Sequence, residues 1–288
     1  MKIHILKTPQ ETRPDTQAFT YPLHNADYGV EQDFLDYLQK NRHLTTEDAS
    51  EARWHYLPIY WTRWHLNHGY GKSGLLELQS QIDSSILDDA KTFTVCQYDD
   101  GPLAEVGKTV LFLSSRKVAS GVDIPLLSTA HRKPFFRRRK KYLASFTGRL
   151  DTHPLRQEMA EALKERRDVY LYDGNKGPNF FVDIMLRSHL ALCPRGYGGS
   201  SFRLFEAMQL GTVPLLVGDI DTRPFKNFLA WDRFSFYAPT VAAIGRILDD
   251  CNALDLPKMA SQARGAFSGD LCFGKWCKFV LKELEGLS

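Results

Sequence analysis

The strongest chemical pattern in this 288-residue chain is a glycine-rich stretch between two apolar runs. Residues 189–193 and 213–217 are apolar and have the length of buried strands. Between them, residues 194–201 contain a proline and glycines that stop a strand, and residues 202–210 form a mostly apolar helix that Gly211 ends. A glycine-rich turn that opens a helix after a buried strand presents backbone N–H groups to an anion such as phosphate.

Two arginines and a glutamate add charge to this stretch. Arg195 and Arg203 carry the forked guanidinium that matches phosphate oxygens, and Glu206 lies one turn after Arg203 on the same helix face. A carboxylate at that place can accept hydrogen bonds from ribose hydroxyls. An ordinary strand–turn–helix with an internal Arg203–Glu206 pair explains the same pattern, so these residues alone leave both interpretations open.

The order of residues in this stretch resembles the signature of the exostosin family of glycosyltransferases. The matching positions are Cys193, Pro194, Arg195, Gly196, Ser201, Arg203, Glu206, Ala207, Met208, Gly211, Pro214 and Asp219. Residues 56–60, 98–102, 121–127 and 146–149 resemble further family segments in the family's order. The resemblance therefore extends over nearly the whole chain.

This resemblance implies an α/β fold of the GT-B type, in which two Rossmann-like domains with parallel sheets face a cleft. The alternation of strands and helices independently predicts parallel sheets covered by helices. We expect an N-terminal acceptor-side domain over residues 1–137 and a nucleotide-sugar-binding domain over 138–288, whose last helix can pack back on the first domain. The basic run 131–141 contains Pro134 and is expected to link the domains.

The resemblance further implies that the C-terminal domain binds the nucleotide of a sugar donor. Arg203 and the glycine-rich loop would contact the diphosphate and Glu206 the ribose, and Ser200 or Ser201 would cap the helix. Arg149, in a turn that resembles a family turn, is a second candidate. The predicted donor ligands are Arg149, Arg195, Gly196, Tyr197, Gly198, Gly199, Ser200, Ser201, Arg203 and Glu206.

Transfer of the sugar needs a base that deprotonates the attacking hydroxyl. The family is inverting, so the resemblance implies one in-line displacement with a base from the N-terminal side of the cleft. Asp99 is the first candidate, because it follows a predicted strand end where ligand-binding loops emerge. Asp100, His65 and His68 are alternatives, and a turn-capping or surface role explains each of these residues equally simply.

The aromatic segment 52–66 is the candidate acceptor site. Trp61, Trp64 and His65 are predicted to lie near the mouth of the cleft, where indole rings can stack on the apolar faces of sugars. An aromatic core explains the same composition, and we prefer that interpretation for Trp54 and Tyr56.

No metal or other cofactor is expected to be required, because arginines and loop amides can stabilise the leaving diphosphate. Asp219-Ile220-Asp221 has the D-x-D spacing of metal-dependent sugar transferases of another fold, but we expect it to form a loop at the cleft. Five cysteines with no C-x-x-C spacing indicate reduced thiols.

The net charge of +3 predicts no nucleic-acid partner. No apolar run is long enough to span a membrane, and residues 1–7 are too short and too charged for a signal peptide. We therefore expect a cytoplasmic protein, or a Golgi-lumenal one if the chain is a trimmed core. The expected function is transfer of a sugar, with a pentose such as xylose preferred, from a UDP-sugar to a hydroxyl of a glycan or glycoprotein. A catalytically inactive module that binds a nucleotide sugar or a glycan is the alternative.

Overall fold

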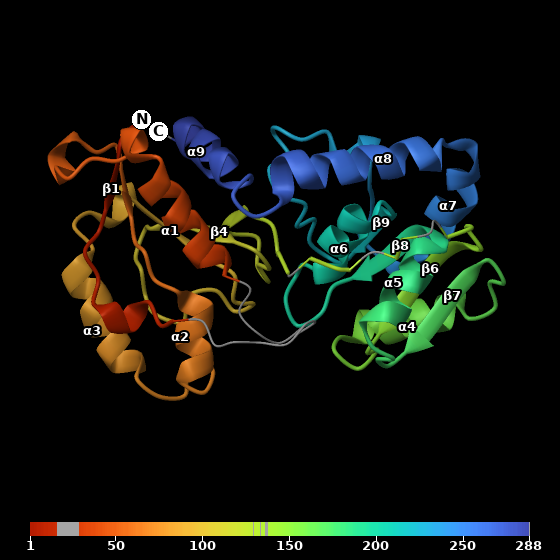
Figure 1. The fold of residues 1–288 in the computed structure, drawn as a ribbon. Coiled ribbons are helices and arrows are strands. Elements are labelled where there is room, and N and C mark those ends of the chain that lie inside the picture. The colour runs from red at the N-terminus through yellow and green to blue at the C-terminus, as the bar shows by residue number, and fades with distance from the viewer. Residues whose placement is uncertain (16–28, 129, 133, 136–137, 288) are drawn as a thin grey trace. The chain divides into compact units, whose positions relative to one another are not determined.

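The chain folds into two compact units, each built on a parallel five-stranded sheet. Unit 1 comprises Met1–Ile124 and Trp276–Ser288, and unit 2 comprises Pro125–Lys275 (Figure 1). The structure, a computed structural model, describes residues 1–15, 29–128, 130–132, 134–135 and 138–287. Two Rossmann-like units with parallel sheets confirm the predicted fold class.

The sheet of unit 1 has its strands in the order of the sequence, β1-β2-β3-β4-β5. These strands are β1 (Ile3–Ile5), β2 (Trp54–Tyr56), β3 (Thr92–Cys96), β4 (Val110–Leu113) and β5 (Val122–Asp123). The helices of this unit are α1 (Val30–Lys40), α2 (Trp61–Asn67), α3 (Leu75–Ser85) and α9 (Cys277–Gly286). Each strand therefore pairs with the strand that follows it along the chain.

Unit 1 buries aromatic rings on one face of its sheet and mostly aliphatic side chains on the other. Phe34 of α1 packs against Phe93 of β3 and against Trp276, with ring centroids 5.8 and 5.7 Å apart. The opposite face holds a cluster to which α2 contributes Trp61 and α3 contributes Leu78. Alternation of side chains along β3 divides the two sets, because successive residues of a strand point to opposite faces.

The sheet of unit 2 has the order β10-β9-β8-β6-β7. Its strands are β6 (Tyr142–Gly148), β7 (Val169–Asp173), β8 (Ser188–Pro194), β9 (Val213–Val217) and β10 (Phe236–Ala238). Its helices are α4 (Pro154–Leu163), α5 (Pro178–Leu186), α6 (Phe202–Leu210), α7 (Val241–Asp250) and α8 (Leu256–Ala266). The predicted strand, glycine-rich turn, helix and strand are β8, the 195–201 loop, α6 and β9.

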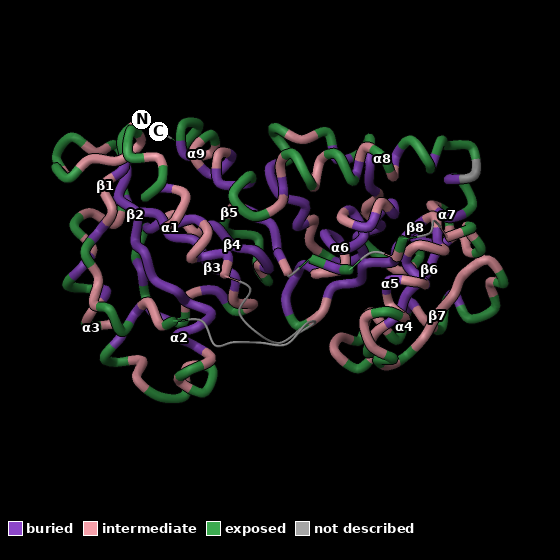
Figure 2. Tube along the Cα trace, viewed as in Figure 1, coloured by how far each residue is buried: buried purple, intermediate pink, exposed green. Residues whose placement is uncertain are grey.

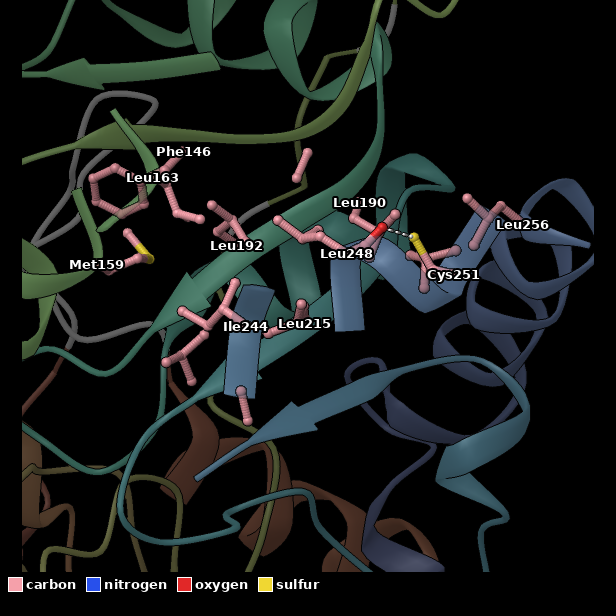
Figure 3. Packing of buried hydrophobic residues seen from close by; sticks show 14 of the residues in the cluster. Phe146, Met159, Leu163, Leu190, Leu192, Leu215, Ile244, Leu248, Cys251 and Leu256 are labelled. Atoms are coloured by element: carbon pink, nitrogen blue, oxygen red, sulfur yellow. Dashed lines mark hydrogen bonds between the residues drawn. The ribbon is translucent and has the colours of Figure 1, made fainter. Parts of the chain in front are cut away.

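The core of unit 2 lies between the sheet and the helices that cover it. Met159 of α4 and Ile244 of α7 pack with Leu192 of β8 and Leu215 of β9 (Figure 3). Figure 2 shows the central strands buried while the outer surfaces of the helices are exposed. Strands buried on both faces need continuous apolar runs, which is why β8 and β9 were recognisable from the sequence.

The described residues of the basic run are grouped with unit 2, whereas the sequence predicted a linker between the domains. Arg138 donates to Asp183 Oδ1 over 2.6 Å, and Lys140 Nζ donates to the backbone oxygen of Ser188 over 2.5 Å. Burial lowers the pKa of Lys140 to about 8. Residues 133, 136 and 137 of the run lie outside the described residues. The expected boundary after residue 137 thus differs from the division after Ile124.

Helices α1 and α2 and the cysteines show further details of the fold. Helix α2 was not predicted, although Trp61, Trp64 and His65 have the i, i+3, i+4 spacing of a buried helix face. Helix α1 begins at Val30, after the N-cap residue Gly29, which has a positive φ of 77°. All five cysteines are free thiols, as predicted.

Candidate functional site

The reversal of strand order in unit 2 creates the candidate site. From β6 the chain proceeds to β7 on one side, and it returns to β8 on the other side before continuing to β9 and β10 (Figure 1). In an open parallel sheet, ligands bind outside the carboxyl ends of the strands at such a switch point. The segments that leave β6 and β8 there are residues 149–153 and 195–201.

The loop from Arg195 to Ser201 contains most of the predicted donor ligands. Tyr197 is exposed, Gly196 is half-buried, and Gly198, Gly199, Ser200 and Ser201 are buried. Ser201 is the N-cap residue of α6, as predicted, but its side chain makes no capping hydrogen bond. The first turn of an α-helix leaves N–H groups without partners inside the helix, so this loop ends at an electropositive helix terminus.

Arg156, in the first turn of α4, ties the two loops together. Its Nε donates to the backbone oxygen of Arg195 and its Nη1 to that of Arg149, both over 2.9 Å. A Cβ on Gly196 would lie 3.1 Å from Arg156 Nη2, so glycine allows this close approach. Burial, followed by the nearby charge of Arg203, lowers the pKa of Arg156 to about 9.

Sequence reasoning missed Arg156, although one signal was present. An arginine in the first turn of a helix is disfavoured by the helix dipole, so its presence there indicates a local role. In this structure Arg156 donates hydrogen bonds to one backbone carbonyl of each loop.

Arg203 lies at the centre of the switch point. Its Nη2 donates to the backbone oxygen of Thr147 over 2.5 Å, and its guanidinium lies 4.4 Å from the ring centroid of Phe146. A Cβ on Gly148 would come within 2.6 Å of Arg203 Nη2, so only glycine fits at the end of β6. Nε of Arg203 is buried and has no hydrogen-bond partner, and burial lowers the pKa of this guanidinium.

Arg195 is already neutralised within the loop, which differs from the predicted contact with a diphosphate. Its Nη1 binds the carboxylate of Asp219, and its Nε donates to the backbone oxygen of Gly198 over 3.3 Å. Burial opposes ionisation of Asp219, but the hydrogen bond and charge of Arg195 outweigh it and lower the pKa of Asp219. Arg195 therefore holds the shape of the loop in this structure.

Glu206 has a partner that sequence reasoning did not find. The Glu206 carboxylate, 5% exposed, lies 2.7 Å from His131 Nε2. The His131 ring stacks on Phe181 with centroids 5.1 Å apart, and Gln209 accepts a hydrogen bond from the His131 backbone N–H. His131 was assigned to the basic run because nothing local distinguishes it from its neighbours.

Arg149 is the first residue after β6, at the exposed start of the 149–153 loop. Its guanidinium makes two hydrogen bonds, of 2.9 and 2.8 Å, to the carboxylate of Asp151, and both side chains are exposed. These bonds, followed by the charge of Asp151, raise the pKa of Arg149. The predicted second donor ligand is therefore at the switch point but paired with a neighbour.

The two carboxylates of the D-x-D sequence are both bound by cations. Asp219 pairs with Arg195, and Asp221 binds Arg223 at 2.9 Å with Lys226 at 3.7 Å. Within the described parts of the chain, no group of three His, Cys, Asp or Glu side chains is arranged to hold a metal ion.

The predicted catalytic residues lie in unit 1, around the carboxyl end of β3 and the end of α2. Asp99 is half-buried in the turn after β3, and the exposed Asp100 binds Lys117 Nζ. His68 Nδ1 lies 2.8 Å from the backbone oxygen of Trp64. Because a carbonyl only accepts, Nδ1 is the donor in this contact.

The predicted acceptor residues belong to the core of unit 1, which corrects the sugar-stacking hypothesis. Trp61 is 0% exposed, and its indole N–H donates to Thr94 Oγ1 over 2.9 Å. Trp64 is also buried and stacks on His68, and His65 is 0% exposed. Rings with no exposed face cannot stack on a sugar, so the aromatic-core interpretation applies to all three.

Comparison with known sequences identifies the family. Residues 103–247, half of the chain, match the Exostosin GT47 domain. The chain belongs to the exostosin GT47 family. This domain includes the glycine-rich loop and α6, so the family signature coincides with the switch point of unit 2.

The chain is similar to plant proteins named as probable glycosyltransferases and glucuronosyltransferases. A probable glycosyltransferase of Arabidopsis thaliana is 25% identical over 244 residues, which are 72% of this chain and 50% of the relative. Another from Arabidopsis is 30% identical over 95 residues, covering 32% and 20%. A probable glucuronosyltransferase of Oryza sativa subsp. japonica is 29% identical over 126 residues, covering 39% and 29%. The chain thus spans half or less of the length of these relatives.

Solved glycosyltransferase structures are similar only at a low level. AviGT4, a glycosyltransferase involved in avilamycin A biosynthesis, has 13% identity and a TM-score of 0.43, with 99% of this chain and 97% of that chain covered. The pneumococcal O-GlcNAc transferase GtfA has 13% identity and a TM-score of 0.39, with 68% and 45% covered.

A membrane-crossing helix would need about 20 apolar residues. Among the residues that the structure describes, no helix combines that length with that apolar character.

Proposed function

We propose that this chain is a glycosyltransferase that moves a sugar from a UDP-sugar to a hydroxyl of a glycan or glycoprotein acceptor, with inversion at the sugar carbon. Membership of the exostosin GT47 family, a family of glycosyltransferases, supports the reaction class. The observation that carries the donor site is the convergence of the β6 and β8 loops, the start of α6 and two half-buried arginines, Arg156 and Arg203, at the switch point of unit 2.

The diphosphate of the donor fits the start of α6. Cleavage of the sugar–phosphate bond leaves negative charge on the diphosphate, which aimed N–H dipoles and cations stabilise. Arg203 supports this role because its Nε has no hydrogen-bond partner and its orientation is fixed by Thr147 and Phe146. Since these groups supply positive charge, we propose that no divalent metal is needed.

The ribose would bind at Glu206. A carboxylate offers about four lone-pair sites, so hydroxyl groups can share it with His131. His131 then acts as a positioning residue that fixes the orientation of the Glu206 carboxylate. The relatives from Oryza sativa that are named probable glucuronosyltransferases make UDP-glucuronic acid one donor to test beside UDP-xylose and other UDP-pentoses.

The base that activates the acceptor would come from the residues near the end of β3 and α2. Asp99 remains the first candidate, because it lies in a loop after the carboxyl end of a parallel strand. Asp100 is paired with Lys117, and His68 donates from Nδ1 to the Trp64 backbone oxygen, so its Nε2 is the candidate basic atom. Asp99→Asn, Asp100→Asn and His68→Gln, each measured for turnover and for UDP affinity, separate the three.

A thermal-shift panel of nucleotides and UDP-sugars, with and without EDTA, tests the proposal. A ligand that binds only the folded protein raises the melting temperature. We expect a UDP-selective rise that survives EDTA, followed by sugar transfer in product analysis with an acceptor. A folded protein that shows no shift with any nucleotide would contradict the donor site. Donor binding without transfer for any acceptor would instead support the inactive binding module.

A further inference from the structure

A column of aromatic rings leads from the core of unit 1 to its surface. Trp61 is fully buried, and its ring centroid lies 6.3 Å from that of His65. His65 lies 4.3 Å from Tyr98, and Tyr98 stacks on Tyr70 at 6.4 Å with an interplanar angle of 29°. Tyr70, the outermost ring, is 58% exposed. The buried rings of the column therefore support Tyr98 and Tyr70, which form its aromatic surface.

The second ring of the column, His65, is unusual because its polar atoms are unsatisfied. His65 is 0% exposed, and neither ring nitrogen has a hydrogen-bond partner. Buried polar atoms nearly always have partners, so an exception of this kind has a stability cost that needs a reason. Desolvation, against the opposing charge of Asp100, lowers the pKa of His65 to about 4, so this ring is neutral near pH 7. A neutral ring can pack closely beneath Tyr98.

The loop that carries Tyr70 is held in a strained conformation. Tyr70 has φ +61°, one of two positive values among the non-glycine residues that the structure describes. Its backbone N–H donates to the His65 oxygen over 2.6 Å. A Cβ on Gly71 would lie 2.4 Å from Leu103 Cδ1, so the loop is packed closely on the turn after β3. Backbone strain of this kind persists where surrounding structure enforces it, and it is concentrated at functional sites.

Two carboxylates lie close enough to Tyr98 for their charges to act on its hydroxyl. Asp99 and Asp100 follow Tyr98 directly, and Lys117 pairs with Asp100. Burial, followed by the charges of Asp100 and Asp99, raises the pKa of Tyr98, so its hydroxyl remains a hydrogen-bond donor. A sugar ring has an apolar C–H face that packs on an aromatic ring and hydroxyls that donate to carboxylates. A negatively charged sugar would be repelled by the same carboxylates.

We propose that Tyr70 and Tyr98 form a stacking platform for a neutral saccharide, whose hydroxyls bind the carboxylates of the turn after β3. This inference rests on the proposed function, because the saccharide bound there would be the acceptor. The platform replaces Trp61 and Trp64, which are buried, as the aromatic surface for a sugar. The fixed loop holds Tyr70 in one orientation before a ligand binds. Binding to this ring pair therefore costs little conformational entropy.

Tyr70→Gly is the sharpest test. Glycine adopts a positive φ freely, so this variant removes the ring and also relieves the backbone strain. Its melting temperature should be equal to or above that of the wild-type protein. Isothermal titration with cello-, xylo- and manno-oligosaccharides, and with an oligogalacturonide as the acidic comparison, measures binding directly. We expect the best-bound neutral oligosaccharide to lose about three- to tenfold in affinity, the loss of one aromatic stacking contact.

Two variants serve as controls. Tyr70→Phe keeps the ring and should keep the affinity. Leu87→Ala removes an exposed apolar side chain of unit 1 elsewhere and should change nothing. Equal affinity in the wild-type and Tyr70→Gly proteins, absence of binding by all three neutral series, or tighter binding of the acidic series would each contradict the platform.

Thermal shift with UDP on the same proteins distinguishes the two proposals. UDP binding that persists in Tyr70→Gly while saccharide binding falls supports the platform. UDP binding with no effect of Tyr70→Gly on saccharides overturns the platform alone. Absence of UDP binding in the wild-type protein argues against the proposed function, and the saccharide titrations still decide the platform.

Discussion

Units 1 and 2 have the same kind of sheet but differ in strand order. In unit 1 each strand pairs with the next along the chain, whereas in unit 2 the chain reverses between β6 and β8. A switch point leaves an open crevice between diverging loops, and a sequential order does not. The predicted ligand residues of unit 2 accordingly gather at one place, and those of unit 1 divide between a buried core and a turn.

The surroundings of the predicted ligand residues also differ between the two units. Unit 2 binds its charged side chains to loop carbonyls and neighbouring carboxylates, as Arg203 does with Thr147 and Arg195 with Asp219. Unit 1 buries Trp61, Trp64 and His65 among apolar side chains. This difference teaches that residues predicted to bind ligands are held by polar loop groups at a switch point in one unit and are packed into the core in the other.

The largest expected effect tests the structural role of the unit 1 aromatics. Trp61→Ala should lower the free energy of unfolding by about 3–5 kcal/mol, because it opens a cavity in a fully buried cluster. Chemical denaturation measures this loss. Affinity for UDP, measured on the protein that remains folded, should be unchanged. If Trp61→Ala reduced UDP affinity while leaving stability intact, the contrast between the two units would be wrong.

Arg203→Ala should have the largest effect on binding. Hydrogen bonds to a charged group contribute about 1.5–3 kcal/mol, so UDP affinity should fall about ten- to a hundredfold. Isothermal titration with UDP measures it. Arg203→Lys should recover part of the affinity, since it keeps the charge but loses the fork. Arg246→Ala on the exposed face of α7 is the matched control, and equal affinity in the Arg203 and Arg246 variants would remove the donor site from the switch point.

The buried His131–Glu206 contact should show coupling. Each of His131→Ala and Glu206→Ala removes a buried contact between an imidazole and a carboxylate and should cost about 1–3 kcal/mol of stability. The double variant should lose less than the sum of the two, because the second change removes a group that has already lost this contact. Denaturation of the four proteins gives the coupling energy, and strictly additive losses would show that the contact contributes nothing.

His65 should make unit 1 sensitive to acid. The histidine pKa is about 6.5 in the unfolded chain and about 4 in the folded one. The unfolded state therefore binds more protons between those values, so stability is retained above pH 6.5 and falls as pH drops toward 4. From pH 7 to pH 5 the expected loss is about 2 kcal/mol. Denaturation at both pH values should show this loss reduced in His65→Phe, and an identical pH dependence in both proteins would exclude His65 as its source.

Arg149→Ala should have the smallest effect. Its pair with Asp151 is exposed on both sides, so stability should not change measurably. The loss of UDP affinity should be smaller than that of Arg203→Ala, because the guanidinium is already bound by a carboxylate. A loss equal to that of Arg203→Ala would show that Arg149 leaves Asp151 to bind the donor.

Much of the fold followed from the sequence. Apolar runs of strand length fixed β8 and β9, and the prolines and glycines at 194–201 fixed the loop that separates β8 from α6. The short helix α2 was missed, because it has only seven residues and its two tryptophans fit a strand or a helix equally well.

For the site, the sequence by itself determined which residues lie in the glycine-rich loop and on α6, since local patterns specify a strand, a turn and a helix start. Only the tertiary structure decided what those side chains bind. His131 and Glu206 are 75 residues apart, and Arg203 and Thr147 are 56 apart, so no local pattern could pair them. The tertiary structure also buried Trp61 and left Tyr70 exposed, because burial depends on which helices cover the sheet and not on the type of the residue.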